Sequence, residues 1–150
     1  HTLIGNYLNI HSNSDYNYCN TNYTISHGES NKTLNLKTGE EENLISWFKD
    51  SEISDGSPVR LSDQLLEFIF ERLDNLPPSY GLTTSEREKC YADSGSDIML
   101  SISNTGFKFE LPPTSNYSCG ESIDISFKEL RPFLSDYGIQ AVNSLVLTKQ

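Results

Sequence analysis

The most regular stretch of the sequence is Leu61-Ser62-Asp63-Gln64-Leu65-Leu66-Glu67-Phe68-Ile69-Phe70-Glu71-Arg72-Leu73-Asp74-Asn75-Leu76. An aliphatic residue stands at every fourth position: Leu61, Leu65, Ile69 and Leu73. This spacing places the four side chains on one face of an α-helix. Ser62 and Asp63 supply a capping oxygen and a favourable charge at its start, and the pair of prolines at 77–78 ends it. The stretch therefore predicts an amphipathic helix that packs on a sheet.

Outward from this helix, alternating apolar and polar residues predict antiparallel strands. Residues 98–102 and 107–111 flank the turn Asn104-Thr105-Gly106, which is typical of a β-hairpin because Asn and Gly accept positive φ. Further strands are expected near residues 3–10, 14–19, 22–27, 32–36, 123–127 and 142–148. Short helices are expected at 44–48, 85–92 and 128–134, and residues 50–58 are interpreted as a loop.

These elements predict one α+β domain over residues 1–150: an antiparallel sheet packed on the main helix, about 61–76, with short extra helices. Neither a repeat nor a linker divides the chain. We expect Leu65, Ile69 and Leu73 to be buried against Phe107 or Phe109. Trp47 with Phe48 fits an anchor for the short helix better than an exposed recognition patch.

Charge and hydropathy exclude several classes of partner. The chain carries 11 Lys and Arg against 21 Asp and Glu, a net charge of -10 with a pI near 4.6. This balance argues against binding to nucleic acid or to an anionic membrane surface. Apolar runs are too short to span a bilayer. No signal-peptide pattern precedes His1, so we expect an upstream segment to have been removed.

No motif for a cofactor, a nucleotide or a nucleophilic serine occurs, and we expect no enzyme activity, no cofactor and no metal site. Residues 50–56 resemble a calcium loop only faintly, since the glycine comes one place late and Leu61 replaces the bidentate Glu. His27 with a cysteine could form a catalytic pair, but an exposed turn histidine is the simpler interpretation.

Acidic residues concentrate between Leu36 and Gly56, where only Lys37 and Lys49 oppose them. The six carboxylates are Glu40, Glu41, Glu42, Asp50, Glu52 and Asp55. Such a surface would steer a basic protein toward the chain, and these six residues are the candidate partner-binding site. The alternative is that acidic loops simply keep the domain soluble.

Four stretches in order carry a resemblance to a known family: residues 14–19, residues 34–40 leading to Trp47-Phe48, the helix at 61–76, and residues 106–134. The order is similar to that of the RsiV-like extracytoplasmic domain of unknown function, the C-terminal domain type of lysozyme-sensing anti-sigma factors. Ser126-Phe127 departs from the Pro-Tyr usual in the family, and residues 24–28 match its Gly-Ala-His/Tyr-Pro stretch only loosely.

The resemblance implies an α+β fold, export to the periplasm, cell surface or exterior, and no established enzymatic activity. It also implies binding of lysozyme in the anti-sigma-factor branch. The first functional hypothesis is accordingly a non-enzymatic binding or sensor domain of the cell envelope that recognises a basic protein such as lysozyme. The alternative is a cell-envelope carbohydrate-active hydrolase or deacetylase, which needs paired carboxylates or a metal triad in a cleft.

Three cysteines leave at least one thiol without an intramolecular partner. A hairpin turning at 104–106 pairs residues whose numbers sum to about 210, and Cys90 and Cys119 sum to 209. We predict a disulfide between them, which the oxidising compartment implied by the resemblance would favour. A bridge from Cys19 to either one, or three reduced thiols, remain open alternatives.

Overall fold

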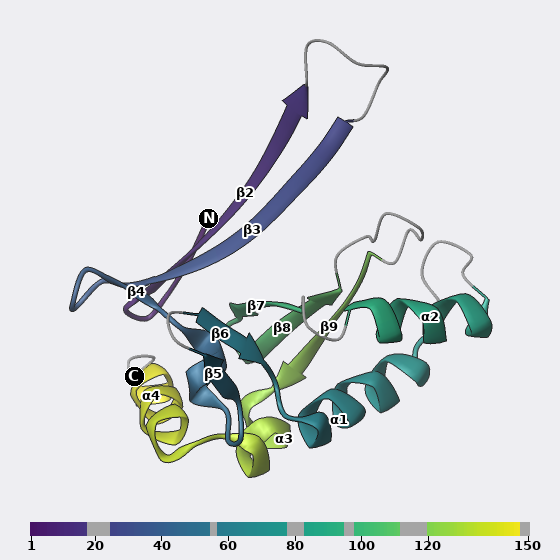
Figure 1. Cartoon of the computed structure of the whole chain (residues 1–150). Coiled ribbons are helices and arrows are strands. Elements are labelled where there is room, and N and C mark those ends of the chain that lie inside the picture. Colours follow the sequence, from purple (N-terminus) through teal and green to yellow (C-terminus); the bar gives the residue numbers. More distant parts are fainter. Residues whose placement is uncertain (18–24, 55–56, 78–82, 95–97, 112–119, 148–150) are drawn as a thin grey trace.

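The structure is a computed structural model that describes residues 1–17, 25–54, 57–77, 83–94, 98–111 and 120–147. Its α+β fold combines antiparallel sheets with helices, as the sequence predicts (Figure 1). The strands divide over three sheets rather than one: β1 to β4, β5 with β6, and β7 to β9. The buried hydrophobic residues among those described form one core cluster with members from Ile4 to Leu145.

The N-terminal sheet is built around two strands of 11 residues, β2 (Tyr7–Asn17) and β3 (Ile25–Asn35). They pair antiparallel along their whole length, and both curve away from the body of the molecule (Figure 1). The short strands β1 (Thr2–Ile4) and β4 (Glu40–Glu42) flank them. The prediction of four short strands here was therefore wrong, because β2 and β3 each continue through polar, Asn- and Ser-rich sequence.

The C-terminal sheet contains the predicted hairpin, β7 (Met99–Ile102) and β8 (Gly106–Leu111), followed by β9 (Glu121–Ser126). Pairs such as Ile102↔Phe107 sum to 209, so the predicted register is confirmed. Tolerance of positive φ was the reason expected from the sequence for this glycine, but a different requirement selects Gly106. A Cβ at this position would lie 1.9 Å from the carbonyl oxygen of Ile125, so glycine is required by the close approach of β9.

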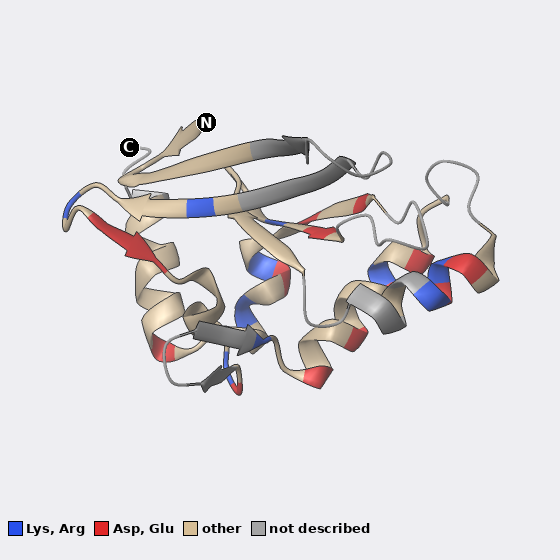
Figure 2. Cartoon of the chain, turned by 45° about the horizontal axis from the view of Figure 1, so that its top comes forward, with Lys and Arg blue, Asp and Glu red and all other residues tan. Residues whose placement is uncertain are grey.

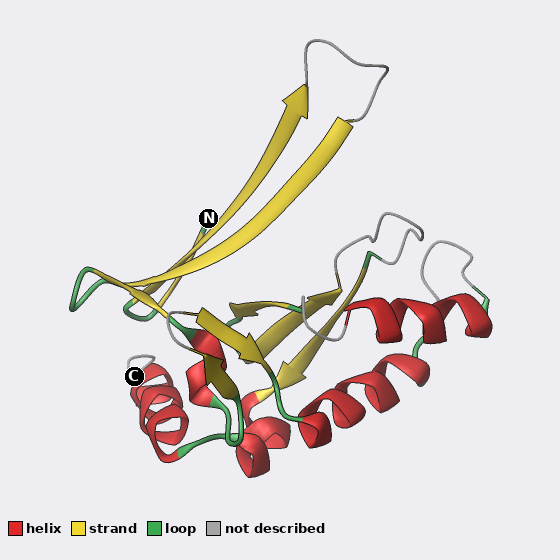
Figure 3. Cartoon of the chain, viewed as in Figure 1, coloured by secondary structure: helices red, strands yellow, loops and turns green. Residues whose placement is uncertain are grey.

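The predicted main helix is present as α1 (Asp63–Asp74), with Ser62 as its N-cap. Leu65, Ile69 and Leu73 are almost completely buried, as predicted, and so are both Phe107 and Phe109. The second helix, α2 (Thr84–Ser94), extends the predicted 85–92 segment by a few residues. Figure 3 shows α1 below the sheet of β7 to β9 and α2 beside it, on the right. Together, this sheet and the apolar face of α1 form much of the core.

Trp47 anchors the short helix η1 (Leu44–Trp47) in the core, as predicted. Its side chain has no exposed surface, and its ring makes edge contacts with Tyr7, Phe107 and Tyr137. Through these contacts Trp47 joins the N-terminal sheet, the sheet of β7 to β9 and the helix over residues 136–147. Trp47 is thus a packing residue and takes no part in an exposed patch.

Two local predictions were wrong. The C-terminal strand expected at 142–148 is the helix α4 (Asp136–Leu147). The Oγ of Ser135 accepts a hydrogen bond from the amide of Gly138, which caps the start of this helix. The loop expected at 50–58 contains a short hairpin, β5 (Glu52–Ser54) and β6 (Ser57–Arg60). The segment expected at 128–134 forms α3 (Phe127–Leu130) and the 3-10 turn η3 (Arg131–Phe133).

The cysteine pairing stays a prediction. Cys90 lies in α2, which is not an extension of β7, so the register arithmetic that motivated the pair does not reach it. Cys19 and Cys119 lie outside the described residues. His27 lies in β3 opposite Asp15.

Candidate functional site

Three of the predicted binding carboxylates, Glu40, Glu41 and Glu42, make up the edge strand β4 (Figure 2). Glu41 pairs with Lys32 at 3.0 Å, and Glu42 accepts hydrogen bonds from Trp47 Nε1 (2.9 Å) and the Tyr137 hydroxyl (2.8 Å). Two of the three are thus engaged within the fold. Charged residues on an edge strand also discourage pairing with a second chain.

Of the other three predicted residues, the structure describes the side chain of Asp50 alone. Asp50 is exposed at a turn and has a positive φ of 53°. Glu52 begins β5, and its side chain lies outside the described part, as does Asp55 altogether. Whether the six carboxylates share one surface therefore stays a prediction, since two of their side chains lie outside the described residues.

A better defined acidic surface lies along the outer side of α1, which we call the α1 groove. It is an open hollow of about 750 Å³. Its floor is apolar and aromatic, and its rim carries four carboxylates and one guanidinium. The lining residues are Arg60, Asp63, Leu66, Glu67, Phe70, Glu71, Asp74, Asn75 and Tyr91. Figure 2 shows acidic positions along α1 on the opposite side of the view from β4.

Helical spacing builds the carboxylate side of the groove. Asp63, Glu67 and Glu71 follow one another at intervals of four residues and so share one face of α1. Asp63 pairs with Arg60 at 2.7 Å. Glu67 and Glu71 have no ion pair or side-chain hydrogen bond with any described residue. These two carboxylates are consequently available to a ligand.

The aromatic floor joins α1 to α2. The rings of Phe70 and Tyr91 stack with centroids 4.3 Å apart and an interplanar angle of 10°. The hydroxyl of Tyr91 donates to Asp74 Oδ1 at 3.0 Å. Burial, followed by this hydrogen bond, raises the pKa of Tyr91 well above its ordinary value. The tyrosine therefore stays neutral, and its stacked ring and hydrogen-bonded hydroxyl form a fixed part of the groove floor.

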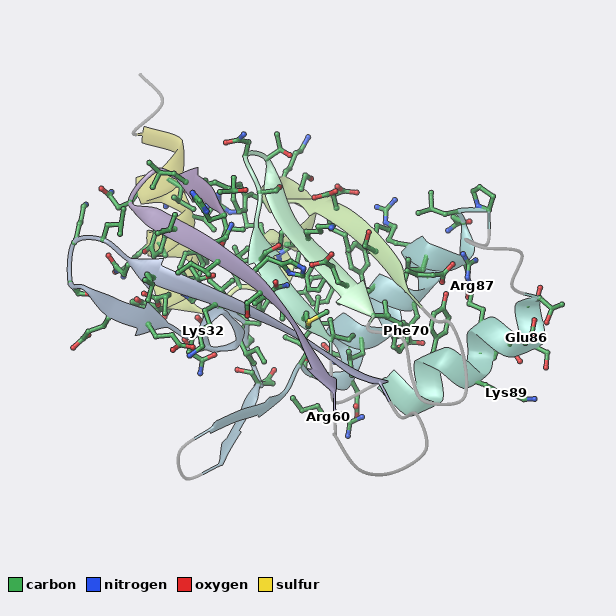
Figure 4. All side chains as sticks on the ribbon, turned by 90° about the horizontal axis from the view of Figure 1, so that it is seen from above. Lys32, Arg60, Phe70, Glu86, Arg87 and Lys89 are labelled. Atoms are coloured by element: carbon green, nitrogen blue, oxygen red, sulfur yellow. The ribbon has the colours of Figure 1, made fainter. Side chains whose placement is uncertain are left out.

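A buried ion pair sets the position of α2 beside the groove. Arg87 and Glu121 are 4% and 3% exposed, and the guanidinium binds the carboxylate through Nε (2.9 Å) and Nη2 (2.6 Å). Arg87 Nη1 also donates to the carbonyl of Leu76 just after α1. Figure 4 labels Phe70 and Arg87, and it shows Lys89 pointing away from the body of the molecule. One side chain thus ties α2 to both β9 and the end of α1.

A second hollow, of about 390 Å³, lies between the first sheet and the β7–β8 hairpin. His11 Nδ1 is 2.6 Å from Asn31 Oδ1, and Asn31 Nδ2 donates to Glu110 Oε2 at 3.0 Å. Because the amide nitrogen faces Glu110, its oxygen accepts from His11, and Nδ1 carries the proton. Glu110 also binds Lys108 and is the one carboxylate among the described residues that line the hollow. These described residues thus do not supply the carboxylate pair of a glycosidase.

Sequence reasoning missed the α1 groove. The four-residue spacing of Glu67 and Glu71 was visible, but nothing in the sequence shows that Tyr91 stacks on Phe70 or that Arg87 reaches Glu121. Within the described residues, no cluster of three or more His, Cys, Asp or Glu side chains is arranged to hold a metal ion.

No helix in the described ranges has the length and apolar character needed to cross a membrane. Comparison of the chain with protein families, with characterised proteins and with solved structures finds no match.

Proposed function

We propose that the chain is a non-enzymatic, extracytoplasmic binding or sensor domain that captures a basic protein such as lysozyme through the α1 groove. One observation carries the proposal: two carboxylates that have no partner among the described residues, Glu67 and Glu71, line the same hollow as the stacked rings of Phe70 and Tyr91. The resemblance to the RsiV-like domain supports the location and the class of partner.

The chemistry of the groove suits a lysine- or arginine-bearing surface. The carboxylates of Glu67 and Glu71 can each accept charge-assisted hydrogen bonds from an ammonium or guanidinium group. The aromatic floor offers apolar contact area for the stem of the same side chain and a ring face for its charge. The net charge of -10 adds long-range attraction that speeds the encounter with a cationic partner.

Binding is tested by titrating lysozyme onto the protein at about 20 mM and about 500 mM salt, since screening weakens contacts between exposed charges. We expect a micromolar complex at low salt that weakens strongly at high salt. Cytochrome c, another small basic protein, serves as a comparison for charge alone. Absence of a salt-sensitive complex with lysozyme would contradict the proposed partner.

A matched pair of variants locates the site. Glu67→Gln/Glu71→Gln removes two carboxylates from the groove, whereas Glu40→Gln/Asp50→Asn removes two from the segment first predicted from the sequence. We expect the groove variant to weaken binding about tenfold and the control to change it less than about twofold. Equal losses in the two variants would mean that the partner senses only net charge.

A further inference from the structure

A third hollow, independent of the α1 groove, lies between α4 and the turn made by α3 and η3. Its volume is about 550 Å³, within the range typical of small-molecule sites, about 300–1,000 Å³. Four apolar side chains form most of its wall: Phe127, Leu134, Ile139 and Val142. We call it the α4 groove. None of the described residues that line it is acidic.

Two cations, Lys128 and Arg131, border this apolar wall. Both are exposed, and neither side chain has an ion pair or hydrogen bond with a described residue. The arginines 60, 72 and 87 are, by contrast, each paired with a carboxylate. Two positive charges that form no ion pair with a described residue thus border one apolar hollow.

The nearest acid in the sequence interacts with Lys128 through charge but forms its ion pair with another residue. Glu129 stands between them, but its Oε1 pairs with Arg72 at 2.7 Å. Its Oε2 accepts from the hydroxyl of Ser126 at 2.6 Å in a capping box. These contacts, led by the hydrogen bonds to Ser126, lower the pKa of Glu129 and hold its carboxylate at the start of α3. Neither Lys128 nor Arg131 is thus held in an ion pair with this carboxylate, and both side chains are exposed.

We propose that the α4 groove binds an amphipathic carboxylate, that is, a small molecule with an acyl chain and one anionic head. The chain would lie on Leu134, Ile139 and Val142, where contact removes apolar surface from water. The carboxylate would meet Arg131, whose planar guanidinium matches its two oxygens, with Lys128 as a second cation. Charge complementarity selects this occupant over a neutral or cationic amphiphile.

The test compares decanoate, decanol and decyltrimethylammonium, which share a ten-carbon chain and differ in head group, by calorimetric titration of the whole chain. We expect decanoate to bind most tightly and the ammonium compound most weakly. Equal affinity for decanoate and decanol would overturn the proposal, as would absence of saturable decanoate binding below about 5 mM.

Variants then assign the binding to this groove. Lys128→Gln/Arg131→Gln should bind decanoate about tenfold more weakly and leave decanol binding unchanged. The control Lys32→Gln/Lys37→Gln removes two positive charges from β3 and the turn that follows it, and it should bind decanoate as the parent does. Circular dichroism checks that both variants fold. Parent-like decanoate affinity in the groove variant would contradict the proposal, because these cations define the site.

Discussion

At the scale of single residues, we expect the stability of the fold to be sensitive to the ion pair Arg87–Glu121, because both charges are buried. Removing the Glu121 charge takes away the short charge-assisted hydrogen bonds of the buried Arg87 guanidinium, whose other carboxylate neighbour, Asp74, lies 3.9 Å away. We expect Glu121→Gln to lower the free energy of unfolding by about 3 kcal/mol in urea titrations. Glu41→Gln breaks the exposed pair with Lys32 and should cost less than about 1 kcal/mol. A similar small effect of both substitutions would show that the Arg87 pair is solvated.

Tyr137 gives the fold a dependence on alkaline pH. Partial burial and the hydrogen bond to Glu42 raise its pKa from 10.0 to about 12. Between these values the folded state retains a proton that the unfolded state has lost. The contribution of Tyr137 is therefore complete below pH 10 and declines as the pH rises toward 12.

The measurement is thermal unfolding across this pH range for the parent and for Tyr137→Phe. We expect the variant to lose less stability between pH 10 and 12, since the substituted ring has no proton to release. Glu42 must also be intact for the effect, because its carboxylate holds the hydroxyl. Identical pH profiles for parent and variant would be inconsistent with a raised pKa at Tyr137.

At the scale of elements, Gly106 decides whether β8 and β9 can pair. An added Cβ would meet the Ile125 carbonyl oxygen at 1.9 Å, so Gly106→Ala must push the two strands apart. We expect a loss of about 1–3 kcal/mol in the free energy of unfolding, the usual cost of overpacking. Gly120→Ala is the control, since no atom lies within 4 Å of its added Cβ. Comparable losses in both would argue against the close approach.

The contrast between α1 and α4 shows which elements could be predicted from the sequence. The period of Leu65, Ile69 and Leu73 matches one face of a helix and is buried as a unit, so pattern and packing agree. In α4, β-branched and aliphatic residues near 142–148 suggested a strand. The helix forms there because Ser135 caps it and because Gly138 lets it approach the Trp47 carbonyl. Neighbours distant in sequence, rather than local preference, decide this case.

At the scale of the whole molecule, acidic and basic side chains cluster in separate regions of the surface. Acidic residues line β4 and the α1 groove, whereas two cations that form no ion pair with a described residue border the α4 groove. The linear sequence showed only the first of these, as the run Glu40 to Glu42. The α1 groove could not be predicted because its floor needs Tyr91 to stack on Phe70, 21 positions earlier, and that contact depends on the buried pair that fixes α2. Composition indicated a basic partner, and tertiary packing determines where we expect it to bind.

The most direct test of the proposed function is hydrogen–deuterium exchange of the chain with and without lysozyme. If the partner occupies the α1 groove, amides of α1 and α2 should exchange more slowly in the complex, and those of β4 and η1 should not change. Protection confined to residues 40–54, or none in α1, would contradict the account.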